Sequence, residues 1–235
     1  MRKELWNQRP VEGGAPKPVW KQPRGSYGSN FWQMYSWKLD RVVHFYSSLE
    51  RDHGVIIEAD PSVASFCEQP VRITIKVDGQ DRETVMDMLI QFTNGRTEYR
   101  EIKYATDVQE GDDQSRAARQ LAAQREWAVV TSNDFKIVTD KEIRRNPTFL
   151  GNWKQIIAYL ATYAAYDLAE IEYKLLVAFD LKQSWSLKDL KHHLGRHDPQ
   201  AVKVAIFRLI HGGQCTAPLD VHPLNNSLTI QRGTK

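Results

Sequence analysis

Three consecutive extended segments, joined by two tight turns, constrain the fold of this chain more than any other feature of its sequence. The run "PVRITIKV" places an apolar residue at every second position, which is typical of a half-buried strand. Asp78-Gly79 predicts a turn into a second strand, "ETVMDMLIQF", and Asn94-Gly95 predicts a turn into a third, "TEYREIKYA". These segments predict an antiparallel meander of three strands.

The segments on either side of this meander predict helices that cover a sheet. Apolar residues recur at helical spacing from Leu39 to Ile57, and we expect Pro61 to end that helix. After the meander, the run rich in Ala, Arg and Gln from Ser115 to Arg125 predicts another helix, and "WAVVTS" predicts a short apolar strand. This order predicts an α/β fold with a mixed sheet flanked by helices.

The last third of the chain has a different pattern. Residues 152–179 are strongly helical, Ser186 and Asp198 are expected to cap two further helices, and two short strands follow. Three helices followed by a hairpin is the order of a winged helix. With a boundary at Asn146-Pro147, we predict an extended arm at 1–36, an α/β domain at 37–146, and a linking helix with a winged-helix domain at 147–235.

Composition excludes several classes of protein. The chain has 235 residues, of which 41% are hydrophobic and 26% charged, and no apolar run approaches the ~18 residues of a membrane span. Its first residues, "MRKELWNQRPVEGG", lack the apolar stretch of a secretory signal. Cys67 and Cys215 have no CxxC spacing, which gives no zinc site and fits a reducing compartment. We therefore expect a cytoplasmic protein with no membrane partner.

Positive charge is concentrated at the start of the chain. Residues 1–45 hold eight Lys or Arg against three Asp or Glu, whereas the remainder holds 24 against 26. The same segment contains four of the seven tryptophans. Basic residues interleaved with aromatic residues suit a polyanion whose bases can stack, such as DNA. The alternative is a flexible tail that docks its aromatic residues on protein.

Three charged residues of the predicted meander form a candidate site. Asp87 lies on a strand face with apolar neighbours, where a charge requires compensation. Glu101 and Lys103 are two residues apart in the next strand, so their side chains share one face. A bound divalent cation would compensate the two acids.

The turn between these strands decides whether the three residues meet. A strict two-residue turn at Asn94-Gly95 pairs Asp87 with Ile102, which faces the wrong way. A three-residue loop at 94–96 pairs Asp87 with Lys103 instead. We therefore predict the three-residue loop, with a bulge or an equivalent slip.

Glu50 is the fourth candidate. On the predicted first helix it shares a largely apolar stripe with Val43, Tyr46 and Ile57. Three carboxylates suit a hard cation, which polarises a phosphate and activates a water, while a lysine stabilises the charged species. The set therefore suits metal-dependent phosphodiester hydrolysis. Alternatively, Glu50 pairs with Arg51 or His53 on a solvated surface, and the loose Asp…Glu-x-Lys spacing arises by chance.

From about Ser36 to Tyr104 the chain resembles the N-terminal nuclease domain of the TnsA family, the endonuclease subunit of heteromeric transposases. The resemblance is carried by "SSLERD" with Glu50, "DPSVASFCEQP" at 60–70, Asp87, and "EIK" with Glu101 and Lys103. It continues more weakly through "WAVVTSNDFKIV" and the tail. The chain departs from the family at Val85-Met86, before the strand Asp, and at Tyr46, where many relatives have Glu. Neither departure removes a charged candidate.

The resemblance implies a restriction-endonuclease-like fold and an enzyme that cuts the 5′ strands at both transposon ends. By resemblance, Glu50, Asp87 and Glu101 would bind Mg²⁺, for which Mn²⁺ would substitute, and Lys103 would assist at the nucleophile or the phosphate. The implied partners are double-stranded DNA at the transposon ends, a DDE-type TnsB-like transposase that cuts and joins the 3′ strands, and a TnsC-like ATPase regulator.

Two other functions remain as alternatives. One is a stand-alone restriction or repair nuclease of the same fold, and the other is a catalytically inactive DNA-binding adaptor. The helix that Asp198 opens offers only Gln200, Lys203 and Arg208 for reading bases. We therefore expect that helix to dock on protein partners, and the specificity for transposon ends to come from the partner transposase.

Overall fold

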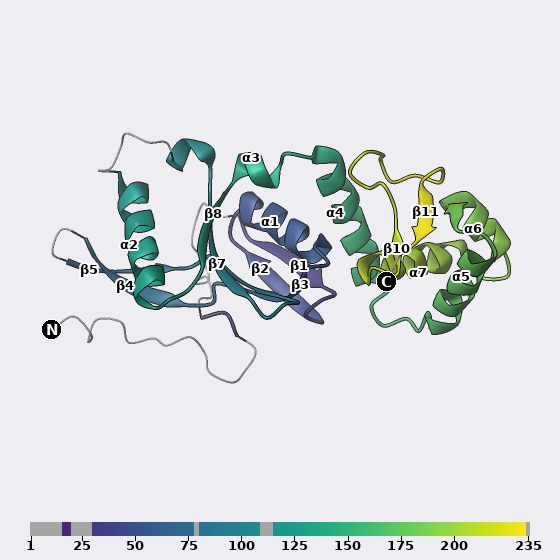
Figure 1. The fold of residues 1–235 in the computed structure, drawn as a ribbon, viewed down its shortest axis with the longest axis horizontal. Coiled ribbons are helices and arrows are strands. Elements are labelled where there is room, and N and C mark those ends of the chain that lie inside the picture. Colours follow the sequence, from purple (N-terminus) through teal and green to yellow (C-terminus); the bar gives the residue numbers. More distant parts are fainter. Residues whose placement is uncertain (1–15, 20–29, 78–79, 109–114, 234–235) are drawn as a thin grey trace. The chain divides into compact units, whose positions relative to one another are not determined.

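The computed structural model describes residues 16–19, 30–77, 80–108 and 115–233. Most of the predicted arm and the predicted Asp78-Gly79 turn therefore lie outside the described residues. The chain divides into two compact units (Figure 1). The first comprises Met1–Met34, Val42–Ile57 and Ser62–Arg145, and the second comprises Tyr35–Arg41, Glu58–Pro61 and Asn146–Lys235.

A mixed sheet of four strands forms the centre of the first unit. Its strands, in spatial order, are β3 (Val63–Glu68), β6 (Met88–Phe92), β7 (Thr97–Lys103) and β8 (Phe135–Thr139). The first three are antiparallel neighbours, whereas β8 runs parallel to β7. The predicted mixed sheet is confirmed. The predicted three-strand meander is wrong, because β4 (Arg72–Val77) and β5 (Gln80–Val85) form a separate hairpin.

Two helices pack against β7 from opposite sides. The Trp127 ring of α2 (Arg116–Val130) meets the Tyr99 ring edge to face, with ring centroids 5.0 Å apart. His53 of α1 (Ser48–Ala59) contacts Arg100. Because consecutive strand residues point to opposite faces, α1 and α2 flank β7 on different sides. Apolar side chains fill the α2 side: Val71, Ile73, Met86, Tyr99, Trp127 and Ala128.

The predicted helix from Leu39 is wrong over its first part. The chain instead forms a hairpin of β1 (Trp32–Ser36) and β2 (Arg41–Phe45), and the helix begins at Ser48. Val43 and Phe45 are fully buried on one face of β2. Their burial favours the two-residue alternation of a strand over the helical spacing of the apolar residues. Val43 and Tyr46 therefore do not share a helical stripe with Glu50.

The predicted strand "WAVVTS" is also wrong. Its residues continue α2 to Val130, and the strand comes later, as β8. Trp127 and Ala128 are buried, whereas Val129 is 78% exposed, because only one side of the last helical turn meets the sheet. Thr131 ends the helix by donating its hydroxyl to the Trp127 carbonyl (2.7 Å).

The hairpin between β6 and β7 has a three-residue loop one position earlier than predicted. The Phe92 N–H donates to the Arg96 carbonyl (2.8 Å), which leaves Thr93–Gly95 as the loop. Gly95 has a φ of 84°, a backbone conformation that favours glycine. The hairpin pairs Met88 with Arg100.

The second unit consists mainly of helices. They are α4 (Pro147–Thr162), α5 (Ala169–Leu181), α6 (Leu187–His193) and α7 (Pro199–His211). A small sheet has the order β10 (Cys215–Thr216), β11 (Thr229–Arg232), β9 (Ser184–Ser186). The predicted caps are confirmed, since Ser186 accepts from the Asp189 N–H (3.0 Å) and Asp198 accepts from the Ala201 N–H (3.1 Å).

Short elements complete the described chain. A 3-10 turn (Ala105–Val108) follows β7, and α3 (Asp140–Ile143) follows β8. Among the described residues, no helix has both the length and the apolar character needed to cross a membrane.

Candidate active site

Glu101 lies on the α2 side of β7, and only 1% of its surface is exposed. Its Oε1 accepts hydrogen bonds from Lys103 Nζ (2.8 Å) and Gln120 Nε2 (3.0 Å), and its Oε2 accepts from Gln124 Nε2 (2.8 Å). The two glutamines of α2 were missed by sequence reasoning. Their spacing of four residues, which places both on one side of a helix, was the available signal.

Asp87 lies at a break in what the sequence predicted as one continuous strand. β5 ends at Val85 and β6 begins at Met88, so that prediction is wrong at this point. The Asp87 Oδ2 accepts from the Ile102 N–H (2.7 Å). Because the ladder of β6 and β7 stops at Met88, the Asp87 carboxylate supplies the acceptor that another strand residue would otherwise provide.

The register corrects the predicted pairing of Asp87. Since Met88 pairs with Arg100, one further step places Asp87 level with Glu101 and not with Lys103. The predicted pairing is therefore wrong by two residues. A shift of two preserves the alternation of strand faces, so Asp87 still comes beside the Glu101–Lys103 pair.

Glu50 lies in the first turn of α1 and has a capping role there. Its N–H donates to Ser47 Oγ (3.0 Å), while its carboxylate Oε2 accepts from the Tyr46 N–H (3.1 Å). The Ser-x-x-Glu spacing of "SSLE" is a capping signature that sequence reasoning missed. The alternative partners considered for Glu50 contact other residues. Arg51 pairs with Asp52 (3.2 Å), and His53 contacts Arg100 (3.1 Å).

Gln69 connects the helix acid to the strand acid. Its Nε2 donates to Glu50 Oε2 (3.4 Å), and its backbone N–H donates to the Asp87 carbonyl (3.0 Å). Gln69 follows β3 with a φ of 41°, in the left-handed region. It belongs to the "EQP" end of the segment 60–70 that carried the resemblance.

Residues 60–140 match a family model described as TnsA-like endonuclease N terminal. The chain carries a TnsA-like endonuclease domain. The predicted resemblance to the TnsA family is confirmed over these residues, which include Asp87, Glu101 and Lys103, whereas Glu50 precedes them. A search of curated proteins found no match to the chain.

Electrostatic interactions couple the four candidate residues, Glu50, Asp87, Glu101 and Lys103. Burial raises the pKa of Asp87 well above its usual range, and repulsion from Glu101 and Glu50 raises it further. Burial also raises the pKa of Glu50 and of Glu101, although hydrogen bonds oppose the rise at both. The pKa of Lys103 is raised, because attraction to Glu101 and Asp87 outweighs the opposing effect of burial.

The donor chemistry of the TnsA-like site suits a hard divalent cation. Three carboxylates that repel one another offer oxygen ligands, and a cation would relieve the repulsion. Within the described residues, however, the structure has no group of three His, Cys, Asp or Glu side chains that lie close enough together to hold a metal ion. Binding would therefore require the candidate carboxylates to move closer together.

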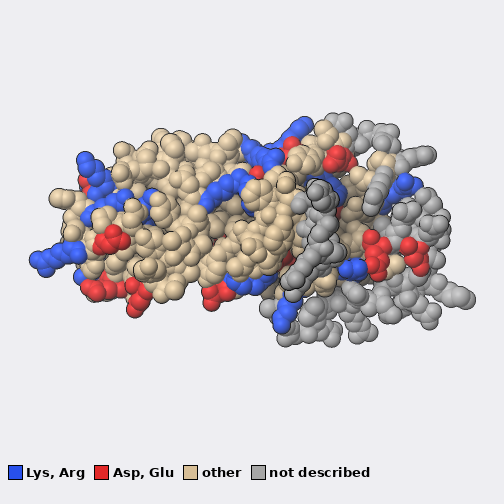
Figure 2. Space-filling view, turned by 180° about the vertical axis from the view of Figure 1, so that it is seen from behind, with Lys and Arg blue, Asp and Glu red and all other residues tan. Residues whose placement is uncertain are grey.

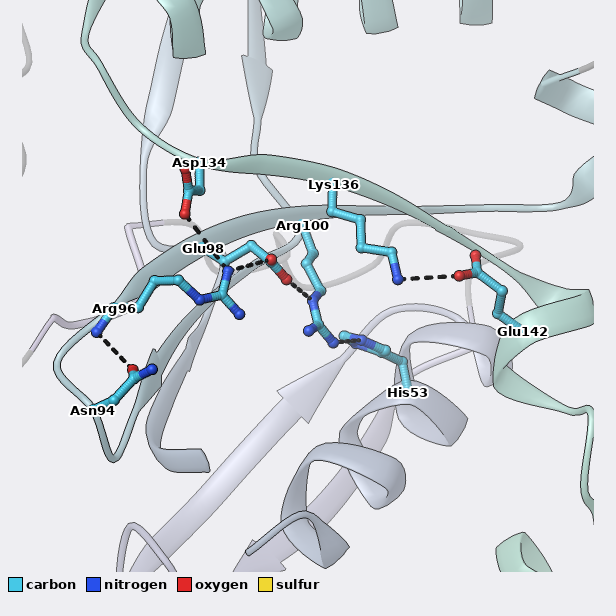
Figure 3. A network of polar contacts seen from close by, with 8 residues as sticks. All are labelled: His53, Asn94, Arg96, Glu98, Arg100, Asp134, Lys136 and Glu142. Carbon is cyan, nitrogen blue, oxygen red and sulfur yellow. Dashed lines mark hydrogen bonds and ion pairs between the residues drawn. The ribbon is translucent and has the colours of Figure 1, made fainter. Parts of the chain in front are cut away.

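A separate polar network occupies the α1 side of β7 in the TnsA-like domain (Figure 3). Glu98 accepts from Arg96 (2.7 Å) and Arg100 (2.7 Å), and Arg100 in turn contacts His53 Nε2 (3.1 Å). Burial, and then the charges of Arg100 and Lys136, lower the His53 pKa to about 3, so the ring is neutral. This network ties α1 to β7 on the face opposite Glu101.

Proposed function

We propose that this protein is a Mg²⁺-dependent DNA endonuclease with a restriction-endonuclease-like fold, the TnsA-like subunit of a cut-and-paste transposase. It would hydrolyse the 5′ strands at transposon ends. One observation carries the proposal: Asp87 meets β7 beside the paired Glu101 and Lys103, inside the domain that matches TnsA-like endonucleases.

The residues of the cluster would have distinct roles. Glu50, Asp87 and Glu101 would hold Mg²⁺, with Mn²⁺ as a substitute. When bound, the cation supplies a polarised phosphate and a water of lowered pKa. Lys103, whose raised pKa keeps its ammonium protonated, would stabilise negative charge at the phosphate.

We propose that the second unit contains a winged helix used for protein contacts. The order α5, β9, α6, α7, β10, β11 supports it, with β11 as the central strand of the sheet. The cations of α7 are already engaged: Lys203 Nζ lies 3.9 Å from the Tyr159 ring centre, and Arg208 donates to the Tyr163 (2.7 Å) and Tyr166 (2.9 Å) carbonyls. Because these two cations already contact groups of the protein itself, the helix is better suited to docking on a protein partner than to reading DNA bases.

The proposed partners are double-stranded DNA at transposon ends, a DDE-type TnsB-like transposase and a TnsC-like ATPase. The transposase would supply the specificity for transposon ends. On the face shown in Figure 2, the Lys and Arg side chains of the described residues are interspersed with Asp and Glu, which gives limited support to strong DNA binding by the lone chain. The buried free thiols of Cys67 and Cys215 suit a reducing cytosol.

Strand-specific cleavage tests the proposal. Transposon-end DNA, labelled on each 5′ strand, is incubated with the protein, with and without its partner transposase, in Mg²⁺ or EDTA. We expect 5′-strand cleavage only with partner and Mg²⁺, and a loss of about 100-fold or more in Asp87→Ala, because Asp87 would hold the cation. Asp134→Ala, an exposed carboxylate at the far end of β8, is the matched control.

The rival functions predict different results from the same assay. Robust sequence-specific cleavage by the lone protein would indicate a stand-alone nuclease. The occupied Glu101 carboxylate favours the other rival, an inactive adaptor. That function predicts that Asp87→Ala and Lys103→Ala change neither cleavage nor the binding of DNA and partner.

A further inference from the structure

Two glutamines of α2 approach Glu101 from the helix side. Gln124 Nε2 lies 2.8 Å from Oε2 and Gln120 Nε2 lies 3.0 Å from Oε1, so each carboxylate oxygen has one amide donor. Gln120 Nε2 also lies 2.9 Å from Thr84 Oγ1 at the end of β5. One turn of helix therefore fixes the rotation of the Glu101 carboxylate in two places.

Packing by itself does not explain a glutamine at position 124. Gln124 has no exposed surface, and its Oε1 is a buried acceptor that has no partner within the described structure. A buried polar atom without a partner is destabilising, so the stabilising contact of this amide is the bond that its Nε2 donates to Glu101. The amide is nevertheless present, and its one bond goes to Glu101.

The attachment of α2 to the sheet does not depend on the glutamines either. Trp127 packs edge to face on Tyr99, and Leu121 and Ala128 are buried on the same helix. Leu121 lies between the two glutamines in the sequence, and Trp127 and Ala128 lie about one turn after Gln124. The helix therefore has an anchor that would survive the loss of either amide bond.

We propose that Gln120 and Gln124 are positioning residues of the candidate site, which limit the orientations that the Glu101 carboxylate can take when it binds a divalent cation. This inference rests on the proposed function. Groups that hydrogen-bond to a ligating carboxylate orient it, and their loss typically costs about 10- to 100-fold in metal affinity or activity. Gln124 acts on Glu101 alone, whereas Gln120 also ties it to β5.

Gln124→Leu separates positioning from packing. We expect its melting temperature to stay close to that of the wild type, because the removal of an unpartnered buried acceptor offsets the loss of one of the three donors to Glu101. Ca²⁺ affinity, measured by calorimetry on the full chain, should fall about 10- to 100-fold. Single-turnover 5′-strand cleavage with the partner transposase should fall by a similar factor, while DNA affinity in Ca²⁺ stays unchanged.

Gln91→Leu is the matched control, because its exposed amide oxygen accepts from Ser65 (2.9 Å) and does not touch Glu101. Gln120→Leu, at a partly exposed position, is the second variant if Gln124→Leu does not fold. Wild-type Ca²⁺ affinity and cleavage in the folded variant would overturn the inference and leave the proposed function intact. A wild-type protein that neither binds Ca²⁺ nor cuts DNA would overturn both.

Discussion

At the residue scale, Lys103 is paired with a carboxylate oxygen of Glu101 that a bound cation would use as a ligand. Its Nζ lies 2.8 Å from Glu101 Oε1, and both side chains are largely buried. We predict that Lys103→Met raises Ca²⁺ affinity, because it removes a competing positive charge, yet lowers cleavage by about 100-fold, because charge at the phosphate is no longer stabilised. Calorimetry and the cleavage assay measure the two effects.

Lys136→Met is the control for this prediction, since Lys136 pairs with Glu142 on an exposed part of β8 and α3. It should leave both quantities near wild type. Weaker Ca²⁺ binding in Lys103→Met would show that the lysine supports the site rather than competing for it.

His53 makes the stability of the protein depend on pH. Its pKa is about 3 in the folded state, against 6.5 for the free side chain, so the unfolded chain binds its proton first as the pH falls. The contribution of neutral His53 to the free energy of unfolding is therefore fully present above pH 6.5 and is lost progressively as the pH falls towards 3. Between pH 6.5 and 5 the loss is about 2 kcal/mol of unfolding free energy.

We predict that His53→Gln removes this pH-dependent loss, although it lowers stability at neutral pH by breaking the contact with Arg100. Urea unfolding of both proteins at pH 7 and pH 5 measures the difference. His222→Gln, at an exposed position, should behave like wild type at both values. Equal pH sensitivity in His53→Gln and wild type would rule out His53 as its source.

At the element scale, two helical glycines distinguish packing from helix propensity. A Cβ at Gly54 of α1 would overlap the fully buried ring of Phe45, whereas a Cβ at Gly151 of α4 meets no atom within 4 Å. We predict that Gly54→Ala destabilises the protein by about 1–3 kcal/mol through overpacking. Gly151→Ala should stabilise it by about 0.5–1 kcal/mol, because alanine favours a helix.

Thermal unfolding of the two variants gives opposite shifts if this argument holds. Both variants make the same Gly→Ala change within a helix, and they differ only in the space around the added methyl group. A stabilised Gly54→Ala would mean that the β1–β2 hairpin yields to the added methyl group, and that Phe45 does not require a glycine opposite it.

At the scale of the whole molecule, segments distant in sequence build one unit. Glu58 lies in the second unit and accepts from Ser36 Oγ (2.6 Å), the Lys38 N–H (2.9 Å) and His211 Nε2 (2.8 Å). Burial raises the pKa of Glu58, but these donors outweigh it and leave the pKa below its usual range. Its contribution to stability is therefore present above pH ~4.5 and is lost as the pH falls further.

We predict that Glu58→Leu lowers the unfolding free energy by about 3–5 kcal/mol, because it removes the buried carboxylate that accepts from Ser36, Lys38 and His211. Glu142→Leu is the comparison, since Glu142 is half exposed and its pair with Lys136 and its bond from the Thr139 N–H (3.0 Å) at the start of α3 are together worth about 1–2 kcal/mol. Urea unfolding measures both. Similar losses in the two variants would show that the Glu58 cluster contributes little.

Local signals were sufficient for some elements of this fold. Ser186 and Asp198 cap helices because a cap depends on the few residues that follow it. The alternation of "PVRITIKV" and "TEYREIKYA" likewise predicted β4 and β7. By contrast, the segments at 41–45 and 127–130 were assigned wrongly, because their mixed apolar spacing fits either a helix or a strand until burial selects one.

The sequence by itself determined which charged residues are available and that Glu101 and Lys103 share a strand face, because that alternation is a property of the extended backbone. Only the tertiary structure decided which other residues contact Glu101 and its strand. The break before β6 turns Asp87 onto the Ile102 N–H, and the docking of α2 brings Gln120 and Gln124 to Glu101. These contacts join segments 15 to 23 residues apart, whose approach depends on packing that no local pattern records.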